Sequence, residues 1–328
     1  MTSAIRRQLL AACAGALATP CVWADEKMRR IAILTVLAPA ESKPYLDALY
    51  GGLRERGWIE GRNLIVDVRY TNGQPPQVSA ATAELLALKP DVFRAALDYV
   101  AKAAAESANP PPIIFAVGND PVGLGLVKSL ARPGTKVTGL SAQSYELMPK
   151  RLSLLKEALP TMAKLGVLEY GRGQPGADTL ALLSQAATTL GIEVLHSRVD
   201  SGEALEPEFK RWANQGVRGF MNLPNIWFSR GDRLQQLSAL ALRYRIATCH
   251  SIAPGADAGL LMSYSVDLID LYRRSAKLVD QILKGGDPAD IPVEQANVYE
   301  LVLNRRTAQD IGIVFPRALL LRATRVVD

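Results

Sequence analysis

Unbroken apolar runs alternate along this chain with segments whose apolar residues recur at helical spacing. Residues 31–36 (IAILTV) form such a run, which is typical of a parallel strand covered on both faces of its sheet. Residues 64–70 instead alternate apolar with charged side chains, a pattern that predicts a half-exposed strand at a sheet edge. The second strand lies at the edge of a doubly wound sheet of order 2-1-3-4-5, so both patterns fit that topology.

The alternation of strands and helices continues in two series. In the first we expect helices at 45–57, 77–88, 98–107 and 121–131 and strands at 91–95, 113–117 and 137–140. In the second we expect helices at 146–159, 177–190, 203–214, 230–244 and 267–285 and strands at 164–170, 192–199, 217–223, 246–249 and 258–265. Repeated βα units predict parallel sheets with right-handed crossovers. No low-complexity linker separates the series, so we expect an α/β protein with two similar lobes that exchange strands at a hinge.

The N-terminal segment 1–24 has the features of a secretory signal peptide. Two arginines precede an apolar stretch too short for a permanent membrane span, and Val22 and Ala24 are the small residues that signal peptidase prefers. A lipoprotein is the alternative, because the sequence up to Cys13 matches a lipid-attachment pattern. Cleavage after Ala24 would leave Cys249 as the only cysteine. We therefore expect an exported, periplasmic protein without an intramolecular disulfide.

Charge and residue types argue against several function classes. Without its first 24 residues the chain has 36 Lys and Arg against 32 Asp and Glu, and a net charge of +4 is too small to predict nucleic-acid binding. His196 and His250 are the two histidines, and no cluster has zinc spacing, so we expect no metal and no cofactor. Cys249 and His250 would point to opposite faces of a strand, which argues against a nucleophilic dyad. We expect that the protein is not an enzyme.

A glycine-rich stretch at residues 118–129 (GNDPVGLGLVKS) resembles a phosphate-binding loop in part. The residues after Gly123 are not the Lys and Ser or Thr that such a loop needs. The pattern instead predicts a strand, a turn and a helix that begins at Pro121 with Asp120 as its N-cap. We expect Gly123 and Gly125 to allow close packing of this helix on the sheet. The turn follows the carboxyl end of a strand, where open α/β sheets bind ligands, and a free helix N-terminus there would favour an anionic group.

Four separated stretches of the chain carry a resemblance to a known family. They are YGGLRERGWIEGRNLIVDVRYTNGQ (50–74), VGNDPVGLGLVKSLARPGTKVTGLS (117–141), GLLMSYSVDLIDLYRRSAKLVDQILKGGDPADIPVEQ (259–295) and YELVLNRRTAQDIGIVFPRALLLRATRVVD (299–328). In this order they resemble the ABC transporter substrate-binding proteins related to tryptophan and tyrosine uptake. The resemblance covers nearly all of the chain after the signal peptide.

The resemblance implies the type I periplasmic binding fold, with two Rossmann-like lobes joined by a hinge that the chain crosses three times. Lobe 1 would comprise residues 28–141 and 266–290, and lobe 2 residues 142–265 and 291–328. A small amino-acid-like or aromatic ligand would bind in the cleft between the lobes and close the hinge. The closed form would dock on an inner-membrane ABC permease with its ATPase. We expect a monomer that binds no nucleic acid.

The family's binding loops correspond by position to the carboxyl ends of strands in this chain. The resemblance places the ligand-binding residues at Pro39, Glu41, Ser42, Leu97, Asp98, Tyr99, Asn119, Asp120, Tyr170, Arg172, Asn225, Trp227, His250, Ser251, Ser263 and Tyr264. Four of these side chains, Tyr99, Tyr170, Trp227 and Tyr264, could sandwich a planar or apolar ligand.

Two turns depart from the family's pattern. The family commonly has a Thr-, Ser- or Gly-rich turn suited to a ligand carboxylate after the third strand, where this chain has ALDY at 96–99. Asp98 in that turn would repel a carboxylate and occupy its donors. In the second lobe Arg172 stands where the family has an Asn- and Pro-rich turn, and an arginine can pair bidentately with an anion. We hypothesise that the ligand differs from tryptophan or tyrosine, or that its carboxylate faces Arg172.

Other functions fit the same fold. A periplasmic ligand-sensing subunit of a signalling receptor would have the same fold, and neighbouring genes for a permease and ATPase or for a kinase would separate the two. An enzyme would need a titratable pair that converges in the cleft. A transcription regulator fits less well, because the first strand directly follows the signal peptide and leaves no room for an N-terminal DNA-binding module.

Overall fold

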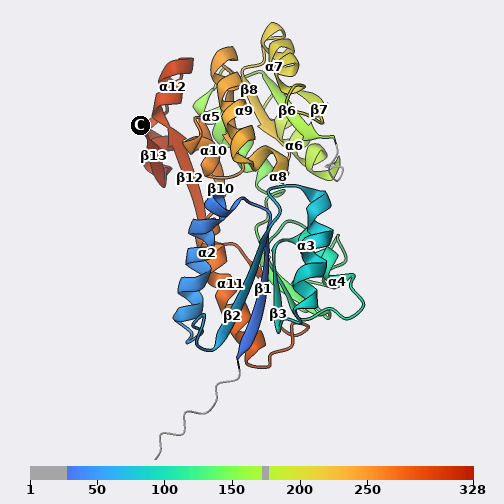
Figure 1. Cartoon of the computed structure of the whole chain (residues 1–328). Coiled ribbons are helices and arrows are strands. Elements are labelled where there is room, and N and C mark those ends of the chain that lie inside the picture. Colours follow the sequence, from blue (N-terminus) through green and yellow to red (C-terminus); the bar gives the residue numbers. More distant parts are fainter. Residues whose placement is uncertain (1–27, 172–176) are drawn as a thin grey trace, which may run out of the picture.

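Residues 28–171 and 177–328 are described by the computed structural model, and they form two α/β lobes, each built on one sheet (Figure 1). The first sheet has the order β11-β5-β4-β3-β1-β2, with β1 (Arg29–Thr35), β2 (Leu64–Tyr70), β3 (Val92–Leu97), β4 (Ile113–Gly118), β5 (Val137–Ser141) and β11 (Glu294–Gln295). All of its strand pairs are parallel. The expected order 2-1-3-4-5 is confirmed, and β2 lies at the edge where its alternating pattern placed it.

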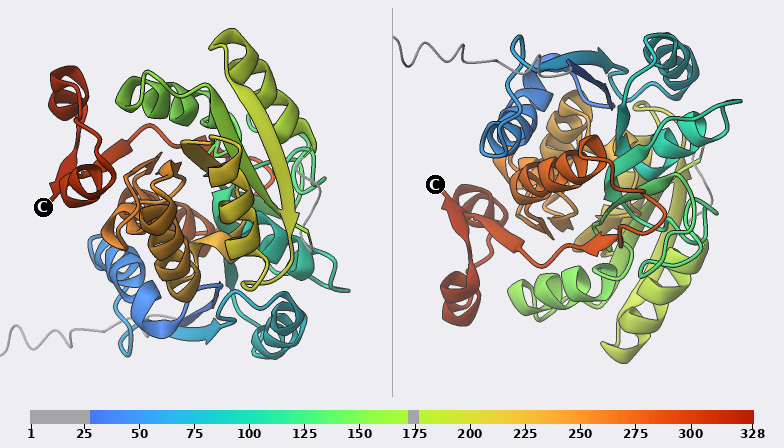
Figure 2. Two further views of the ribbon diagram at one scale, coloured as in Figure 1. Left: turned by 90° about the horizontal axis from the view of Figure 1, so that it is seen from above. Right: turned by 90° about the horizontal axis from the view of Figure 1, so that it is seen from below.

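The second sheet has the order β13-β12-β10-β9-β8-β6-β7. Its strands are β6 (Lys164–Tyr170), β7 (Glu193–Val199), β8 (Gly219–Asn222), β9 (Ala247–His250), β10 (Met262–Val266), β12 (Tyr299–Asn304) and β13 (Arg325–Val327). The pair β10–β12 is antiparallel and the other pairs are parallel. The apolar pattern does not predict β12 and β13. The C-terminal segment that contains them lies at one side of the molecule (Figure 2).

Helices cover both faces of each sheet. In the first lobe α2 (Pro39–Arg54) and α11 (Leu268–Leu283) pack on one face, and α3 (Pro75–Ala87) and α4 (Asp98–Ala105) on the other. In the second lobe α5 (Met148–Ala158), α6 (Ala177–Thr189), α12 (Arg305–Ile311) and α13 (Arg317–Arg322) share one core, and α7 (Leu205–Asn214), α8 (Ile226–Ser229) and α9 (Gly231–Tyr244) the other. The short helix α10 (Pro254–Asp257) follows β9. The expected two-lobed α/β class is therefore confirmed.

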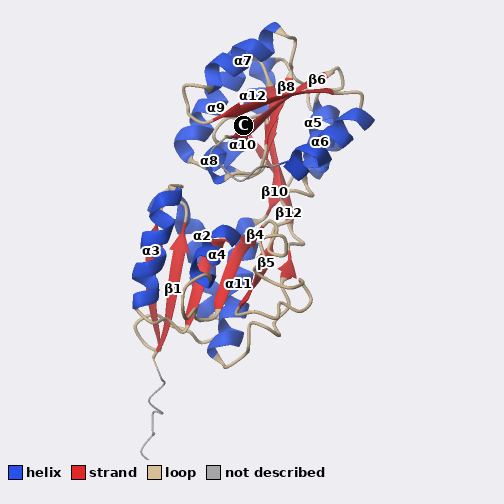
Figure 3. Cartoon of the chain, turned by 90° about the vertical axis from the view of Figure 1, so that its right-hand side faces the viewer, coloured by secondary structure: helices blue, strands red, loops and turns tan. Residues whose placement is uncertain are grey.

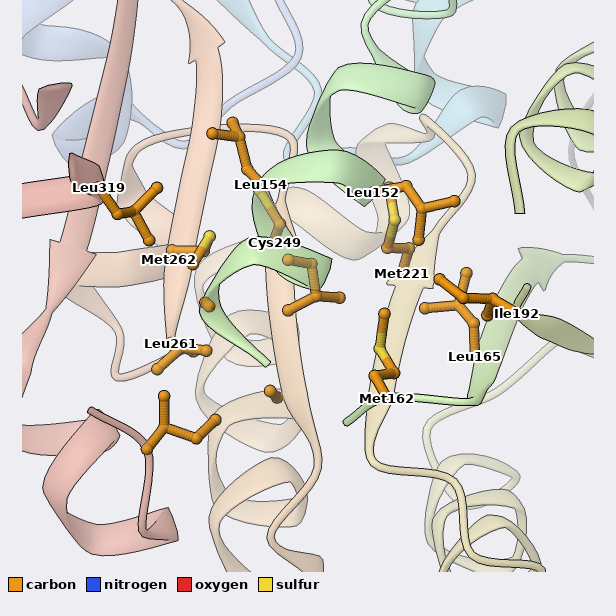
Figure 4. Close-up of a cluster of buried hydrophobic side chains, with 14 of the residues drawn as sticks. Leu152, Leu154, Met162, Leu165, Ile192, Met221, Cys249, Leu261, Met262 and Leu319 are labelled. Carbon is orange, nitrogen blue, oxygen red and sulfur yellow. The ribbon is translucent and has the colours of Figure 1, made fainter. Parts of the chain in front are cut away.

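The apolar runs of the sequence are buried because successive residues of a strand point to opposite faces of the sheet, and a hydrophobic core covers each face. In β1, Ile31 and Ile33 belong to the core under α2 and α11, whereas Ala32 and Leu34 belong to the core under α3 and α4. The second lobe has the same construction. Figure 4 shows one of its cores, in which Leu152 and Leu154 of α5 approach side chains of the sheet such as Met221 and Cys249. Cys249 is a buried free cysteine.

Strands and crossover segments join the lobes. In β10, Met262 belongs to a core of the second lobe and Val266 to a core of the first. β12 likewise runs from Tyr299, which packs against the first lobe, to Leu303 in the second, and Figure 3 shows both strands between the lobes. β11 extends the first sheet by pairing with β5, although the expected division assigned residues 291–328 to lobe 2.

The helix expected at residues 121–131 is wrong, because this segment forms turns. Leu126 and Val127 are buried in the core under α3 and α4, so the apolar spacing reflects burial of an irregular segment. Gly125 has a φ of 70°, and nothing lies within 4 Å of where its Cβ would be, so it serves backbone conformation and not packing. At Gly123 an added Cβ would lie 2.0 Å from Oδ2 of Asp120. The predicted packing role of both glycines on the sheet is therefore also wrong.

Candidate functional site

The carboxyl ends of β1, β3 and β4 face the second lobe, and the predicted lobe 1 residues lie in the segments that follow these strands (Figure 1). The exposed Pro39 and Glu41 lie in the first turn of α2. Ser42 is buried, and its Oγ lies 3.1 Å from Oγ1 of Thr35, so its hydroxyl already has a partner. Tyr99 packs against the core under α3 and α4, and burial raises its pKa to about 12.

Asp98 organises the turn between β4 and the following segment. Its Oδ2 accepts hydrogen bonds from the backbone N–H groups of Asn119, at 2.6 Å, and Asp120, at 3.2 Å, and its Oδ1 accepts one from Tyr99, at 2.8 Å. Burial raises the pKa of Asp98, and the three N–H donors act against this rise. The turn is completed by Asp120, whose Oδ1 accepts the N–H of Gly123. The structure thus brings together Asp98, Asn119 and Asp120.

The predicted lobe 2 residues Tyr170, Asn225 and Trp227 also lie together. The rings of Tyr170 and Trp227 stack 4.8 Å apart with an angle of 13° between their planes. Oδ1 of Asn225 accepts the N–H of Trp227 at 2.9 Å and thereby caps α8. The guanidinium of Arg233 lies 4.0 Å from the centre of the Trp227 ring, at cation–π distance. Trp227 is nearly buried by these neighbours, so Tyr170 presents the more accessible ring.

The two lobes touch where α8 and α9 meet the start of α2. Oε1 of Glu41 accepts the N–H of Gly231 at 3.2 Å, and Oε2 accepts the N–H of Ala38 at 3.3 Å. Ile226 of α8 packs against the core of the first lobe under α3 and α4. Segments that follow the carboxyl ends of strands in both sheets therefore face each other, which is the position at which α/β sheets bind ligands.

The predicted residues next to the hinge are less accessible. His250 and Ser263 face each other across the pairing of β9 with β10, and both side chains are fully buried. Tyr264 stacks on Tyr299, with ring centres 6.0 Å apart, and Ser251 is half-buried. The four aromatic side chains expected to sandwich a ligand do not form one open slot, because Tyr170, Trp227 and Tyr264 have ring partners within the protein and Tyr99 packs in a core.

Neither a surface hollow nor a metal-binding cluster among the described residues adds to the site between the lobes. A hollow of about 380 Å³ is lined by Pro39, Lys43 and Tyr50 among others, and it lies along α2 and not between the lobes. Arg172 lies outside the described residues, so its role stays a prediction. Within residues 28–171 and 177–328, no group of three or more His, Cys, Asp or Glu side chains could hold a metal ion. The helices of these residues include none long and apolar enough to cross a membrane.

Comparison with known families agrees with this architecture. The sequence profile of the family described as ABC transporter substrate binding protein matches residues 30–327. The chain belongs to this family. It is therefore a solute-binding component of an ABC transporter and not an enzyme.

Individual relatives of this substrate-binding protein are distant. The tyrosine-binding protein of Clostridioides difficile (strain R20291) is 25% identical over 266 residues, which cover 80% of this chain and 74% of that protein. An ABC domain from Streptococcus pneumonia, solved in complex with L-Trp, is 22% identical with a TM-score of 0.82 and covers 92% of this chain and 100% of its own. The ligand-free, open structure of a substrate binding protein with adhesive properties from Clostridium difficile has a TM-score of 0.70 at 19% identity, covering 92% and 99%. At these identities the solved structures show a shared fold.

Sequence reasoning missed several residues of the site in this substrate-binding protein. Tyr145, on the crossover after β5, lies close enough to Asp98 and Asp120 for both carboxylates to act on it, and burial raises its pKa to about 12. Arg233 and Gly231 approach Trp227 and Glu41 from α9, although no motif marks them. The position of Tyr145 directly after a lobe crossing is a signal that could have found it. The contact of Gly231 with Glu41 has no comparable signal, because it joins residues 190 positions apart.

The buried His250 predicts a loss of stability in mild acid. Its Nδ1 accepts the N–H of Ile252, and burial, with a smaller contribution from the charge of Arg151, lowers its pKa to about 4. An unfolded histidine titrates near 6.5, so the unfolded state binds more protons between these two values and stability falls as the pH drops through them. Between pH 7 and pH 5 we expect His250 to account for a loss of roughly 2 kcal/mol in the free energy of unfolding.

Urea unfolding of the wild type and of His250→Asn at the two pH values measures this contribution. The asparagine Oδ1 can replace Nδ1 as acceptor but does not titrate, and titrating groups common to both proteins cancel in the comparison. The variant should therefore lose less stability than the wild type on going from pH 7 to pH 5. An equal loss in both proteins would show that His250 takes up a proton between pH 7 and pH 5 in the folded state as it does in the unfolded state.

Proposed function

We propose that this chain is the extracytoplasmic solute-binding component of an ABC importer and binds a small aromatic or amino-acid-like molecule between its lobes. The observation that carries the proposal is the apposition of strand carboxyl ends from two sheets, one bearing Asp98 and Asn119 and the other Tyr170 and Trp227. The family match supports transport, and the tyrosine-binding and L-Trp-bound relatives support an aromatic ligand. A membrane permease with its ATPase would take the ligand from the closed form.

Hinge closure is the mechanism that this arrangement favours. A ligand that contacts both walls stabilises only the conformation in which the walls are close, so binding shifts the population toward the closed state. Strands β10 and β12 belong to both lobes and would bend, while the cores at their two ends stay packed. Residues 1–24, outside the described part of the chain, would direct export as a signal peptide, and the mature protein would begin at Asp25.

A thermal-shift screen of the mature protein tests this function. The probes are L-tryptophan, L-tyrosine, tryptamine and tyramine, with glucose as a non-aromatic control. A ligand at 100 times its Kd should stabilise the fold by roughly 2.7 kcal/mol, which is readily seen as a rise in melting temperature. We expect at least one aromatic probe to give this rise and Tyr170→Leu, which keeps apolar bulk but lacks the ring, to weaken it. A response to glucose and to none of the aromatic probes would contradict the proposal.

A further inference from the structure

The lobe 1 wall already contains a carboxylate where a ligand's carboxylate would bind. Asp98 is 5% exposed, and its two oxygens accept hydrogen bonds from the backbone N–H groups of Tyr99, Asn119 and Asp120. Two of these donors lie directly after β4, at the carboxyl end of a central parallel strand. Backbone N–H groups at such positions are the usual donors for carboxylate and phosphate groups. In this chain the anion that they bind is part of the protein.

The carboxylate of a ligand at this wall would find these N–H groups already hydrogen-bonded to Asp98. It would also be repelled by other negative side chains. The exposed carboxylates of Asp120 and Glu41 follow the ends of β4 and β1, the strands on either side of β3. Oδ1 of Asn119 is buried and has no hydrogen-bond partner among the described residues, so this wall has a surplus of acceptor oxygens. An acceptor surplus is satisfied by a ligand that brings N–H donors, and a protonated amine brings three together with a favourable charge.

We propose that Asp98 is a specificity-determining residue: it keeps ligand carboxylates off the lobe 1 wall and selects aromatic molecules that present a protonated amine there. The proposal rests on the proposed function and narrows its ligand class from amino acids such as tryptophan toward aromatic amines without an α-carboxylate. Asp98 exerts this selection because its two oxygens occupy these three N–H groups. Its removal would free the donors for a ligand carboxylate.

Isothermal titration with two matched probes tests the proposal. Tryptamine and L-tryptophan share an indole and an amine and differ in the carboxylate, so the ratio of their Kd values isolates the response to that group. We expect wild-type protein to bind tryptamine at least tenfold more tightly than L-tryptophan. In Asp98→Ser, which frees the backbone donors, the ratio should fall at least tenfold. Glu106→Ser removes an exposed carboxylate just past the other end of α4 and should leave the ratio unchanged.

The outcomes separate this proposal from the proposed function. Wild-type protein that binds L-tryptophan at least as tightly as tryptamine, or a ratio that Asp98→Ser does not change, would overturn the specificity role and leave the transport function standing. No binding of any aromatic probe would overturn both. If Asp98→Ser does not fold, the ratio of the two Kd values is compared between the wild type and Asp98→Asn instead. The asparagine removes the charge while its Oδ1 still accepts N–H bonds, so the ratio should fall only a few-fold.

Discussion

Replacing Trp212 with alanine should lower the free energy of unfolding by about 3–5 kcal/mol, the usual cost of truncating a buried tryptophan. Trp212 is fully buried on α7, with its ring centre 5.5 Å from that of Phe209 and 6.4 Å from that of Phe220. On the sheet it packs over Gly166, where an added Cβ would lie 2.7 Å from three ring atoms. These neighbours are held by a sheet and by other rings, so they cannot collapse into the space that the indole leaves. Urea unfolding followed by circular dichroism measures the change.

Two further variants make the Trp212 measurement specific. Leu321→Ala is the matched control, because Leu321 is 76% exposed and its truncation should change stability by less than about 0.5 kcal/mol. Gly166→Ala should cost about 1–3 kcal/mol by overpacking against the indole. The double variant Gly166→Ala with Trp212→Ala should cost less than the sum, because the clash disappears with the ring. A Trp212→Ala protein within 1 kcal/mol of wild type would contradict this description of the core.

The topology of the first lobe could be predicted from the sequence, because the burial of a strand determines its pattern of apolar and polar residues. A strand covered on both faces, such as β1, reads as an unbroken apolar run, and the edge strand β2 alternates because one of its faces is half exposed. Both patterns fit the order 2-1-3-4-5 of a doubly wound sheet. They also place the binding loops, because a parallel sheet brings the carboxyl ends of its strands to one edge.

Apolar spacing is a weaker guide where backbone conformation decides the structure. Residues 121–131 have helix-like apolar spacing, yet two glycines within five residues each disfavour a helix by about 1 kcal/mol relative to alanine. Gly125 adopts a left-handed conformation, and Leu126 and Val127 both donate their N–H groups to the carbonyl of Pro121, so the chain forms turns. Their burial against the core needs no helix.

The contacts that define the candidate site could not be predicted, because they join residues far apart in sequence. The Asp98 carboxylate accepts the N–H of the next residue, Tyr99, and also holds the turn 21 and 22 residues later. Because the rings of Tyr170 and Trp227 stack on each other, they likewise cannot enclose a ligand between them. Sequence places side chains near a site, whereas their pairing depends on tertiary geometry.

Replacing Arg151 with methionine should lower the free energy of unfolding by about 3 kcal/mol, because hydrogen bonds to charged groups contribute about 1.5–3 kcal/mol each. Arg151 is buried on α5, where burial lowers its pKa to about 10. Its Nε donates to the carbonyl of Tyr264 at 2.7 Å, and its Nη1 donates to the carbonyl of Ser144 at 2.8 Å. Tyr264 lies in β10 and Ser144 on the crossover after β5, so one side chain ties together two of the segments that connect the lobes.

For a second buried arginine, Arg94, we expect no such cost. Arg94 is fully buried in β3, where its Nε reaches Oγ of Ser275 at 3.3 Å and its guanidinium lies 3.9 Å from the Tyr272 ring centre. Its Nη1 and Nη2 have no hydrogen-bond partner among the described residues, and burial lowers its pKa. Because an apolar side chain in place of a poorly bonded buried charge is often neutral or stabilising, Arg94→Met should stay within about 1 kcal/mol of wild type or exceed it.

Parallel urea unfolding of Arg151→Met, Arg94→Met and Lys150→Met separates the contribution of hydrogen bonds from that of a buried charge. Lys150 is the exposed neighbour of Arg151 on the same helix, so its variant controls for helix propensity and added apolar surface. If only Arg151→Met loses much stability, the loss is due to the two hydrogen bonds that Arg151 donates to backbone carbonyls. Equal losses in both arginine variants would instead mean that packing of the long side chain dominates. In that case Arg151 would contribute packing, and no specific link, to the hinge.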